Sequence, residues 1–427
     1  MKVFVGPASH LEGSIRVPPS KNYTSRYIWV SALAEGESVI EHPATNEDAQ
    51  ALMACCRQLG ADMRVDGERL LIKGFGASPS PAGVLDPGNG GLILRLLLPV
   101  GLLLPELKFV TSYPESLGQR PQGDLLAALR QLGAETRDVD GHLPITIRRG
   151  RTLTQRAVTV SGRVSSQFAT ALLMIAPLLG GLAISITDGL VSQPPLATTL
   201  QVMAEAGIPP QANWDRLFFQ VPGGTYRSGR YRVPGDYPAA SALLAAAALV
   251  PSEVTLYPLD PDDQQGEKEV IPYLRQMGVG IETKDHTVTI RGGTPLSAQD
   301  FNGEKAIDAV LSMAAVACFT AGRTTFSQVA NLRWKESDRI GDLACELRKL
   351  GVKVQVTADG FVIDGNPAGY EGGIELEGGQ DHRLVMTFAV LALRTQKGLV
   401  INGAEHVRKS YPDFFTALAA LGVDVRM

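Results

Sequence analysis

The sequence has few cysteines, no block of basic residues and no apolar run that is long enough to cross a bilayer. Its four cysteines, Cys55, Cys56, Cys318 and Cys345, show neither a CxxC pair nor the spacing of metal ligands. A disulfide between the neighbours Cys55 and Cys56 would be strained. We therefore expect reduced cysteines that serve packing, and no metal site.

The longest apolar runs, 92–105 and 171–186, are short for a bilayer span and are interrupted by Arg95, Pro99 or paired glycines. The first residues, MKVFVGPASH, lack the apolar stretch of a signal peptide. Buried helices explain the apolar runs better. We expect a mature cytoplasmic protein that does not bind membranes.

The net charge of -4 and the absence of a Lys/Arg block exclude a general attraction to nucleic acid or to an anionic membrane. An anionic ligand must therefore be bound by locally placed cations. With 44% hydrophobic and 20% charged residues, the chain of 427 residues can bury a large core. Its length alone suggests two or three domains.

A pattern of an amphipathic helix, a glycine and alternating apolar positions recurs six times. The glycines are Gly60, Gly133, Gly207, Gly278, Gly351 and Gly422, at successive intervals of 73, 74, 71, 73 and 71 residues. Glycine suits this position because a helix often ends in a left-handed residue, for which a side chain is unfavourable. The pattern predicts a repeated unit of helix, glycine turn and β-hairpin.

A second element alternates with the first: a polar cluster followed by an Ala/Leu-rich helical run, also six times. The six segments are PSKNYTSRYIWVSALA, GNGGLILRLLLPVGLL, VSSQFATALLMIAPLL, GDYPAASALLAAAALV, AIDAVLSMAAVACF and QDHRLVMTFAVLAL. Helices that are apolar all round are buried, and the start of a helix favours anions. The polar residues are also ordinary helix caps, but their recurrence with inserted cations indicates a shared anionic site.

Six units of about 72 residues fit two domains of three repeats each. We expect one domain to comprise 1–15 plus 235–427, with the first strand at 1–5, and the other to comprise 16–234. The chain would then cross between domains near 16–20 and near 231–235, where Pro18, Pro19 and Pro234 favour extended backbone.

Several side chains in the first half could bind anions. Lys21 and Arg26 flank a helix start, Arg95 follows the glycine-rich second cluster, and Arg120 lies in a loop where an arginine is more often solvated. The cluster Ser165, Ser166 and Gln167 offers hydroxyl, amide and backbone donors at a helix start. No His/Asp pattern marks either serine as a nucleophile.

In the second half, charged residues gather at three helix starts. The segment KESDR places Lys335 and Arg339 on one face of an expected helix, with Glu336 beside them. Asp308 stands at the head of an apolar run, where a carboxylate needs a partner or acts as a plain cap. Asp381, His382 and Arg383 open the sixth apolar helix, and Lys409 follows it.

At these residues the whole chain resembles the 5-enolpyruvylshikimate-3-phosphate synthases. PSKNYTSR is similar to the family's PGSK-type motif and GNGGLILR to its GNAGTAMR loop, and QRP, SSQF, KESDR and DHR follow in the family's order. The resemblance implies a two-domain inside-out α/β barrel of six βαβαββ units. It also implies transfer of the enolpyruvyl group of phosphoenolpyruvate to shikimate 3-phosphate, with no metal or organic cofactor.

The resemblance also assigns site residues. For phosphoenolpyruvate it implies Lys21, Gly91, Arg120, Arg339, Arg383 and Lys409. For shikimate 3-phosphate it implies Asn22, Arg26, Ser165, Ser166, Gln167, Ser192, Asp308, Asn331 and Lys335.

We expect Asp308 to take the proton of the attacking hydroxyl, and Glu336 with Lys21 to serve the methylene carbon and the leaving phosphate. We expect a monomer.

Three features depart from the family pattern. Asn22 replaces a serine and Pro195 replaces a tyrosine, and both bear on which ring substrate is bound. Leu92 and Leu96 replace threonine and proline in the second motif, which predicts a displaced helix around Arg95 and reduced sensitivity to glyphosate.

Three alternatives remain open. A UDP-N-acetylglucosamine enolpyruvyl transferase shares the Lys21-Asn22 pair but usually carries a reactive cysteine in the loop that corresponds to 113–121, where this chain has none. A non-catalytic anion-binding homologue would have no use for the carboxylates Asp308 and Glu336. An RNA 3'-phosphate cyclase would be expected to show a nucleotide-linking histidine and a basic face, and we find no such pattern.

Overall fold

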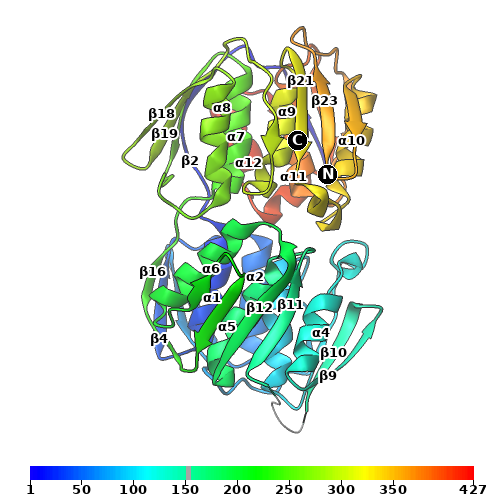
Figure 1. Ribbon diagram of the computed structural model, residues 1–427. Coiled ribbons are helices and arrows are strands. Elements are labelled where there is room, and N and C mark those ends of the chain that lie inside the picture. The colour runs from blue at the N-terminus through cyan, green and yellow to red at the C-terminus, as the bar shows by residue number, and fades with distance from the viewer. Residues whose placement is uncertain (151–154) are drawn as a thin grey trace. The chain divides into compact units, whose positions relative to one another are not determined.

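The computed structural model describes residues 1–150 and 155–427 (Figure 1). The chain forms two compact units. Unit 1 comprises Met1–Pro18 and Pro234–Met427, and unit 2 comprises Pro19–Val233. Within the described ranges each unit holds three four-stranded sheets, and unit 2 also has a two-stranded sheet of β3 (Ala34–Glu35) and β15 (Tyr226–Arg227).

Every four-stranded sheet of unit 1 has one parallel pair of strands followed by two antiparallel pairings. The first is β2 (Leu11–Arg16), β17 (Ser252–Tyr257), β19 (Thr287–Arg291) and β18 (Gly280–Lys284). The second is β20 (Phe301–Asn302), β21 (Gly322–Ser327), β23 (Phe361–Gly365) and β22 (Lys353–Val356). The third is β24 (Ile374–Glu377), β25 (Leu399–Asn402), β1 (Lys2–Val5) and β26 (Val425–Arg426).

The sheets of unit 2 follow the same plan. The first is β16 (Arg230–Arg232), β4 (Glu37–Glu41), β6 (Arg69–Lys73) and β5 (Asp62–Asp66). The second is β7 (Val84–Leu85), β8 (Glu106–Phe109), β10 (His142–Arg149) and β9 (Ala134–Val139). The third is β11 (Ala157–Gly162), β12 (Gly181–Leu190), β14 (Phe218–Pro222) and β13 (Gln211–Asn213).

Helices complete each repeat. Between the parallel strands β11 and β12 lies α5, and α6 connects β12 to the hairpin of β13 and β14, which gives the order βαβαββ. Three repeats take a strand from a distant part of the chain: β2 pairs with β17, β16 pairs with β4, and β1 pairs with β25 and β26. The predicted α/β class with six repeated units is confirmed.

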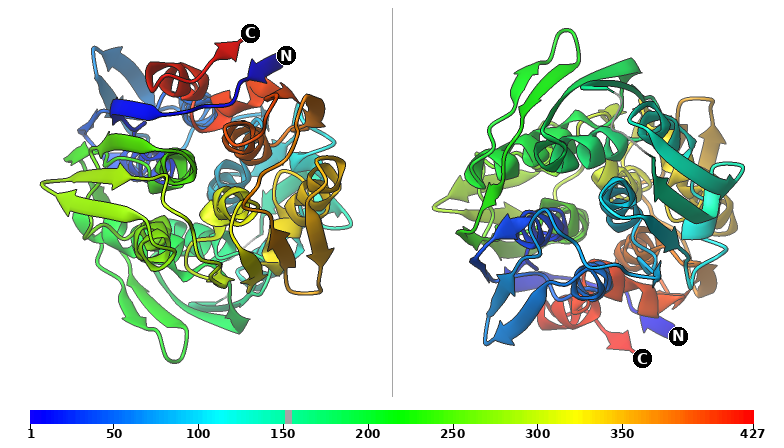
Figure 2. Two further views of the ribbon diagram at one scale, coloured as in Figure 1. Left: turned by 90° about the horizontal axis from the view of Figure 1, so that it is seen from above. Right: turned by 90° about the horizontal axis from the view of Figure 1, so that it is seen from below.

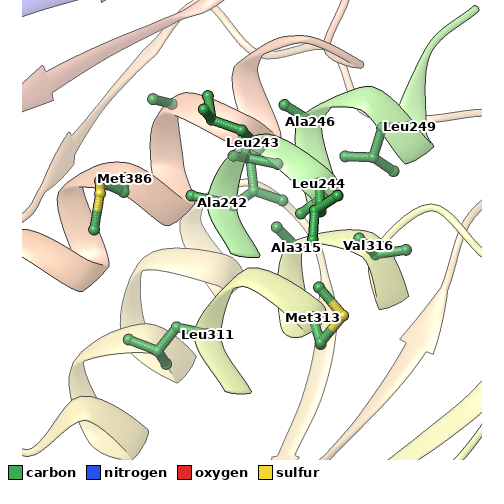
Figure 3. Packing of buried hydrophobic residues seen from close by; sticks show 14 of the residues in the cluster. Ala242, Leu243, Leu244, Ala246, Leu249, Leu311, Met313, Ala315, Val316 and Met386 are labelled. Atoms are coloured by element: carbon green, nitrogen blue, oxygen red, sulfur yellow. The ribbon is translucent and has the colours of Figure 1, made fainter. Parts of the chain in front are cut away.

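The apolar helices are buried inside each unit, and the sheets lie outside them (Figure 2). These helices are α1 (Lys21–Ala32), α3 (Gly91–Leu97), α5 (Gln167–Ile175), α7 (Tyr237–Leu249), α9 (Val310–Ala317) and α11 (His382–Ala392). Every residue of α7, α9 and α11 is buried, and these three helices pack on one another through small and branched side chains such as Leu243, Leu244 and Ala315 (Figure 3). An apolar surface on all sides requires this central position.

The amphipathic helices are α2 (Glu47–Gln58), α4 (Gly123–Gln131), α6 (Gln193–Glu205), α8 (Val270–Gln276), α10 (Arg339–Lys349) and α12 (Phe414–Ala420). Each is followed by its repeat glycine. The φ angles of Gly60, Gly133, Gly207, Gly278, Gly351 and Gly422 are 103°, 96°, 86°, 102°, 90° and 98°. This left-handed backbone is the physical reason for the glycine spacing in the sequence.

Candidate active site

In unit 1, the guanidinium group of Arg339 lies among three carboxylates. Its Nε donates to Asp381 Oδ2 at 2.7 Å, its Nη2 donates to Glu336 Oε2 at 2.9 Å, and its Nη1 donates to Asp308 Oδ1 at 3.2 Å. A second bond joins Nη2 to Asp381 Oδ1 at 3.2 Å. The residues come from different repeats, so only the folded unit assembles them.

Helix starts position these groups. Asp308 lies in the short 3-10 helix η5 (Ile307–Ala309) directly before α9, and Asp381 caps α11 by accepting a hydrogen bond from the backbone N–H of Arg383. Arg339 is the first residue of α10. Asp308 is therefore not a plain cap, because its carboxylate is bonded to Arg339 rather than to its own helix.

The expectation that Lys335 and Glu336 are helical is wrong. Asp338 accepts a hydrogen bond from the N–H of Gly341 and so caps α10, which begins only at Arg339. Lys335 and Glu336 lie in the preceding loop, after the 3-10 helix η6 (Ala330–Trp334) that contains Asn331. The loop nevertheless brings Lys335 Nζ within 3.9 Å of Asp308 Oδ1.

Two further cations join the cluster. Lys409, at the end of the 3-10 helix η7 (Ala404–Lys409), places its Nζ 3.0 Å from Glu336 Oε1. Arg383 Nη2 lies 3.9 Å from Asp308 Oδ2, and its Nη1 donates to the carbonyl of Pro238 at 2.6 Å. The Nε of Arg383 is buried without a hydrogen-bond partner. A buried, incompletely bonded guanidinium group is suited to bind an anion.

Burial differs sharply across this cluster. The side chains of Arg339 and Asp381 are 2% and 0% exposed, whereas that of Asp308 is 25% exposed. Burial alone lowers the pKa of Arg339, but Asp381, Glu336 and Asp308 more than offset this and raise it above its ordinary value. Arg339 is thus a permanent cation, and Asp308 is the most accessible of its three carboxylate partners.

In unit 2, Arg95 forms a buried network. Its Nη1 donates to Ser165 Oγ at 3.1 Å and to Gln167 Oε1 at 2.7 Å, and its Nε donates to Gln122 Oε1 at 3.1 Å. Its guanidinium group also lies over the ring of Phe168. Arg95 therefore orients other polar side chains, a role different from the direct anion clamp that the sequence suggested.

Arg120, after the 3-10 helix η2 (Leu117–Gln119), is buried rather than solvated. Its carbonyl accepts a hydrogen bond from Gln122 Nε2 at 3.1 Å. Its Nη1 lies so close to Gly91 that a Cβ atom on Gly91 would be 2.5 Å away. The absence of a side chain at Gly91, the first residue of α3, therefore lets Arg120 lie over this helix start.

The first turn of α1 carries Lys21 and Asn22. Lys21 Nζ lies 3.1 Å from Asp48 Oδ2 in the first turn of α2. Arg26, one turn later, is buried, and it donates from Nε to Thr199 Oγ1 at 2.9 Å and from Nη2 to the carbonyl of Pro195 at 2.9 Å. Burial lowers the pKa of Arg26 to about 10, although Tyr23 raises it slightly.

The remaining predicted residues of unit 2 also stand at helix starts. Ser166 precedes α5 and Ser192 precedes α6, each as the capping residue without a side-chain cap bond. Ser192 is buried and has a left-handed backbone with a φ angle of 56°. Such a conformation is uncommon for serine and is often found at functional sites.

Comparison with known proteins gives a match over nearly the whole chain. The family described as EPSP synthase (3-phosphoshikimate 1-carboxyvinyltransferase) matches residues 5–418. The chain belongs to this family. A protein of Deinococcus radiodurans named 3-phosphoshikimate 1-carboxyvinyltransferase is 46% identical, over 98% of this chain and 95% of that protein. A Burkholderia pseudomallei protein of the same name is 36% identical, over 99% and 95%.

Solved structures of the EPSP synthase of Acinetobacter baumannii share the fold of this member of the family. One has a TM-score of 0.80 at 24% identity and another a TM-score of 0.81 at 23% identity, each covering all of both chains. The inside-out α/β fold is therefore confirmed. The full-length family match does not favour the alternative readings as a UDP-N-acetylglucosamine enolpyruvyl transferase, an anion-binding homologue or an RNA cyclase.

The predicted residues of unit 1 come together in one cluster, apart from Asn331, which lies in the helix before Lys335. Sequence reasoning missed Glu267, Asp48 and Gln122. Asp48 stands at a helix start and Gln122 lies in the QRPQG loop, and these positions could have indicated both as site residues. The sequence has no such signal for Glu267.

Two negative observations apply to the residues that the structure describes. Among them, no helix is both long and apolar enough for a membrane span. Over the same residues, no group of three or more His, Cys, Asp or Glu side chains is arranged to hold a metal ion.

Proposed function

We propose that this member of the EPSP synthase family transfers the enolpyruvyl group of phosphoenolpyruvate to the 5-hydroxyl of shikimate 3-phosphate and releases phosphate. The full-length match to the family carries the proposal. The cluster around Arg339 supports it, because four cations and three carboxylates lie together where an anionic substrate and proton transfers are both required.

In unit 1 we assign phosphoenolpyruvate to Arg339, Arg383 and Lys409. The incompletely bonded guanidinium group of Arg383 supports this assignment. Asn331, Lys335 and Asp308 are assigned to the phosphorylated ring, and the exposure of Asp308 supports its contact with a hydroxyl group.

The assignments in unit 2 rest on the family pattern and on the helix-start positions described above. The phosphoenolpyruvate ligands are Lys21, Gly91 and Arg120. The ring ligands are Asn22, Arg26, Ser165, Ser166, Gln167 and Ser192. Arg26 and Gln167 already bond to protein groups, so they bind the substrate only by sharing or exchanging those bonds.

The chemistry requires three proton transfers. Asp308 takes the proton of the 5-hydroxyl as its oxygen bonds to C2 of phosphoenolpyruvate, while an acid, Glu336 with Lys21, protonates the methylene carbon. The tetrahedral intermediate then loses phosphate from C2 and returns a proton from the new methyl group to Glu336, which restores the double bond. Cations stabilise the anionic groups throughout, and the reaction needs neither a metal nor an organic cofactor.

Units 1 and 2 are, in this proposal, the two domains of a monomeric enzyme of the cytoplasm, and the chain crosses between them within 16–20 and 231–235. The prolines Pro18, Pro19 and Pro234 stand at the unit boundaries. The four cysteines, all in the described part of the chain, form no disulfide, which suits a reducing compartment. Light scattering of the purified protein tests the monomer.

Phosphate release from phosphoenolpyruvate tests the activity, with shikimate 3-phosphate as acceptor and UDP-N-acetylglucosamine in parallel. Release with shikimate 3-phosphate alone is the expected result. Release with UDP-N-acetylglucosamine alone assigns a different acceptor, and release with neither contradicts the proposal.

A further inference from the structure

Glu267 is a buried carboxylic acid at the edge of the Arg339 cluster. It lies in the 3-10 helix η4 (Gly266–Glu269), which packs against η5, the turn that carries Asp308. Glu267 Oε1 accepts a hydrogen bond from the backbone N–H of Asp308 at 3.3 Å. The two residues are 41 positions apart in the chain, and Glu267 is only 8% exposed.

The segment that presents Glu267 is itself held in place. Gln265, two residues earlier, accepts from the N–H of Tyr237 at 3.0 Å and donates from Nε2 to the carbonyl of Gly235 at 2.8 Å. Asp263 Oδ1 accepts from the N–H of Gln265 at 2.7 Å. These bonds fix the position of the Glu267 carboxyl group relative to the start of α7.

The carboxylate and the backbone N–H of Asp308 contact different groups. Its carboxylate faces Arg339, Lys335 and Arg383, at the distances given above, whereas its backbone N–H is bonded to Glu267. A shift of η5 would change the direction of the Asp308 carboxylate. A hydrogen bond from a fixed, buried acceptor resists such a shift.

We propose that Glu267 is a positioning residue for proton transfer by Asp308, and that its carboxyl group anchors the η5 turn. The proposal rests on the function proposed above, because it assigns Asp308 its role. It adds a group that touches neither substrate and acts through the direction and the electrostatic surroundings of Asp308.

The surroundings of Glu267 favour its neutral form. Burial, and then the neighbouring Asp308, raise its pKa to about 8, although two backbone N–H groups and Arg383 act in the other direction. Other titratable groups come from the elements that pack on η4. The turn η5 carries Asp308, which lies next to Glu267. The titratable side chains of α7 and α8 donate to backbone carbonyls instead of to Glu267: Tyr237 to that of Asp260, Tyr273 to that of Gln299, and Arg275 to that of Ile281.

Three variants separate anchoring from charge. Glu267→Ala removes the acceptor, and Glu267→Gln keeps an acceptor oxygen without a titratable proton. Glu269→Gln is the matched control, because Glu269 is exposed on the same short helix. At pH 7 we expect kcat of Glu267→Ala to fall about tenfold or more with KM of both substrates nearly unchanged, whereas Glu267→Gln retains most of the wild-type kcat.

The pH profile supplies the readout that a purely structural residue would not change. As the pH rises through about 8, wild-type Glu267 becomes charged beside Asp308, and Glu267→Gln does not. This added negative charge repels the anionic substrates, so the ratio of kcat/KM of Glu267→Gln to that of the wild type should rise several-fold between pH 7 and pH 9. For Glu269→Gln the ratio should stay constant.

A stability measurement tests the same group without any substrate. Because the pKa of folded Glu267 is raised, its contribution to stability is complete below the ordinary glutamate pKa and is lost as the pH rises through about 8. The urea midpoint of Glu267→Gln should therefore rise relative to that of the wild type over this range. Glu269→Gln should show no such trend.

These outcomes distinguish the two proposals. Wild-type protein that releases no phosphate from the two substrates contradicts the proposed function, and the urea series still decides whether Glu267 is held neutral. An active wild type with a flat kcat/KM ratio for Glu267→Gln overturns the positioning proposal, as does a Glu267→Ala variant with wild-type kcat. If Glu267→Ala does not fold, the Glu267→Gln series alone decides.

Discussion

Arg339 binds the carboxylate of Asp381 through two hydrogen bonds, from Nε to Oδ2 at 2.7 Å and from Nη2 to Oδ1 at 3.2 Å. The pair joins the first residue of α10 to the capping residue of α11, and both side chains are buried. It therefore fixes two helix starts relative to each other, and with them the first-turn residue Arg383. The stability of unit 1 and the geometry of the site depend on the same contact.

The first prediction concerns this pair. Asp381→Ala leaves the buried charge of Arg339 with fewer partners, and we expect it to lower the free energy of unfolding by roughly 3 kcal/mol. Urea denaturation measures the change. The control is Asp364→Ala, which removes the partner of Arg323 in an exposed pair of unit 1 and should have little effect. Equal effects of the two substitutions would contradict the structural role of the buried pair.

The second prediction concerns proton transfer. Asp308→Asn keeps the shape of the side chain but removes the base, so kcat should fall by about 10²-fold to 10⁴-fold. Binding of shikimate 3-phosphate, measured by calorimetry, should change much less. An unchanged kcat would refute the assignment of Asp308.

The third prediction concerns the close approach of Gly91 and Arg120. In Gly91→Ala the new Cβ would be 2.5 Å from Arg120 Nη1, so the guanidinium group must move. We expect KM for phosphoenolpyruvate to rise about tenfold, with KM for shikimate 3-phosphate nearly unchanged. Gly83→Ala is the control, because a Cβ there meets no atom within 4 Å. A wild-type KM in Gly91→Ala would speak against Arg120 as a ligand.

The fourth prediction concerns Arg95. Arg95→Ala removes the donor shared by Ser165, Gln167 and Gln122, and we expect KM for shikimate 3-phosphate to rise about tenfold or more as these side chains lose their orientation. The control is Arg130→Ala, since Arg130 bonds Thr136 and Asp138 on the exposed surface of unit 2. If both variants bind shikimate 3-phosphate like the wild type, the network does not position the ring ligands.

The fifth prediction concerns inhibition. Leu92 and Leu96, both buried on α3, replace the threonine and proline of the family pattern, and we expect weaker inhibition by glyphosate than in sensitive members of the family. Leu92→Thr should increase the sensitivity. Dose-response curves at a fixed phosphoenolpyruvate concentration compare the two proteins, and inhibition of the wild type as strong as in a sensitive member would refute the prediction.

The sequence by itself determined the repeat and its elements. A glycine with positive φ after each amphipathic helix is a requirement of the local backbone, so Gly60 and its five equivalents recur at a fixed interval and reveal six units. Apolar runs such as 237–249 predicted buried helices because burial follows directly from their composition. The order of short motifs also indicated the family.

Tertiary structure alone decided how the side chains meet. Arg339 bonds Asp308 and Asp381 from 31 and 42 positions away, and Glu267 reaches Asp308 across 41, distances at which neither helical nor strand periodicity carries information. The sequence likewise showed Arg95 as a cation but not that its donors are used by neighbouring side chains. Periodicity is a local property of the chain, whereas these contacts are set by how separate repeats pack.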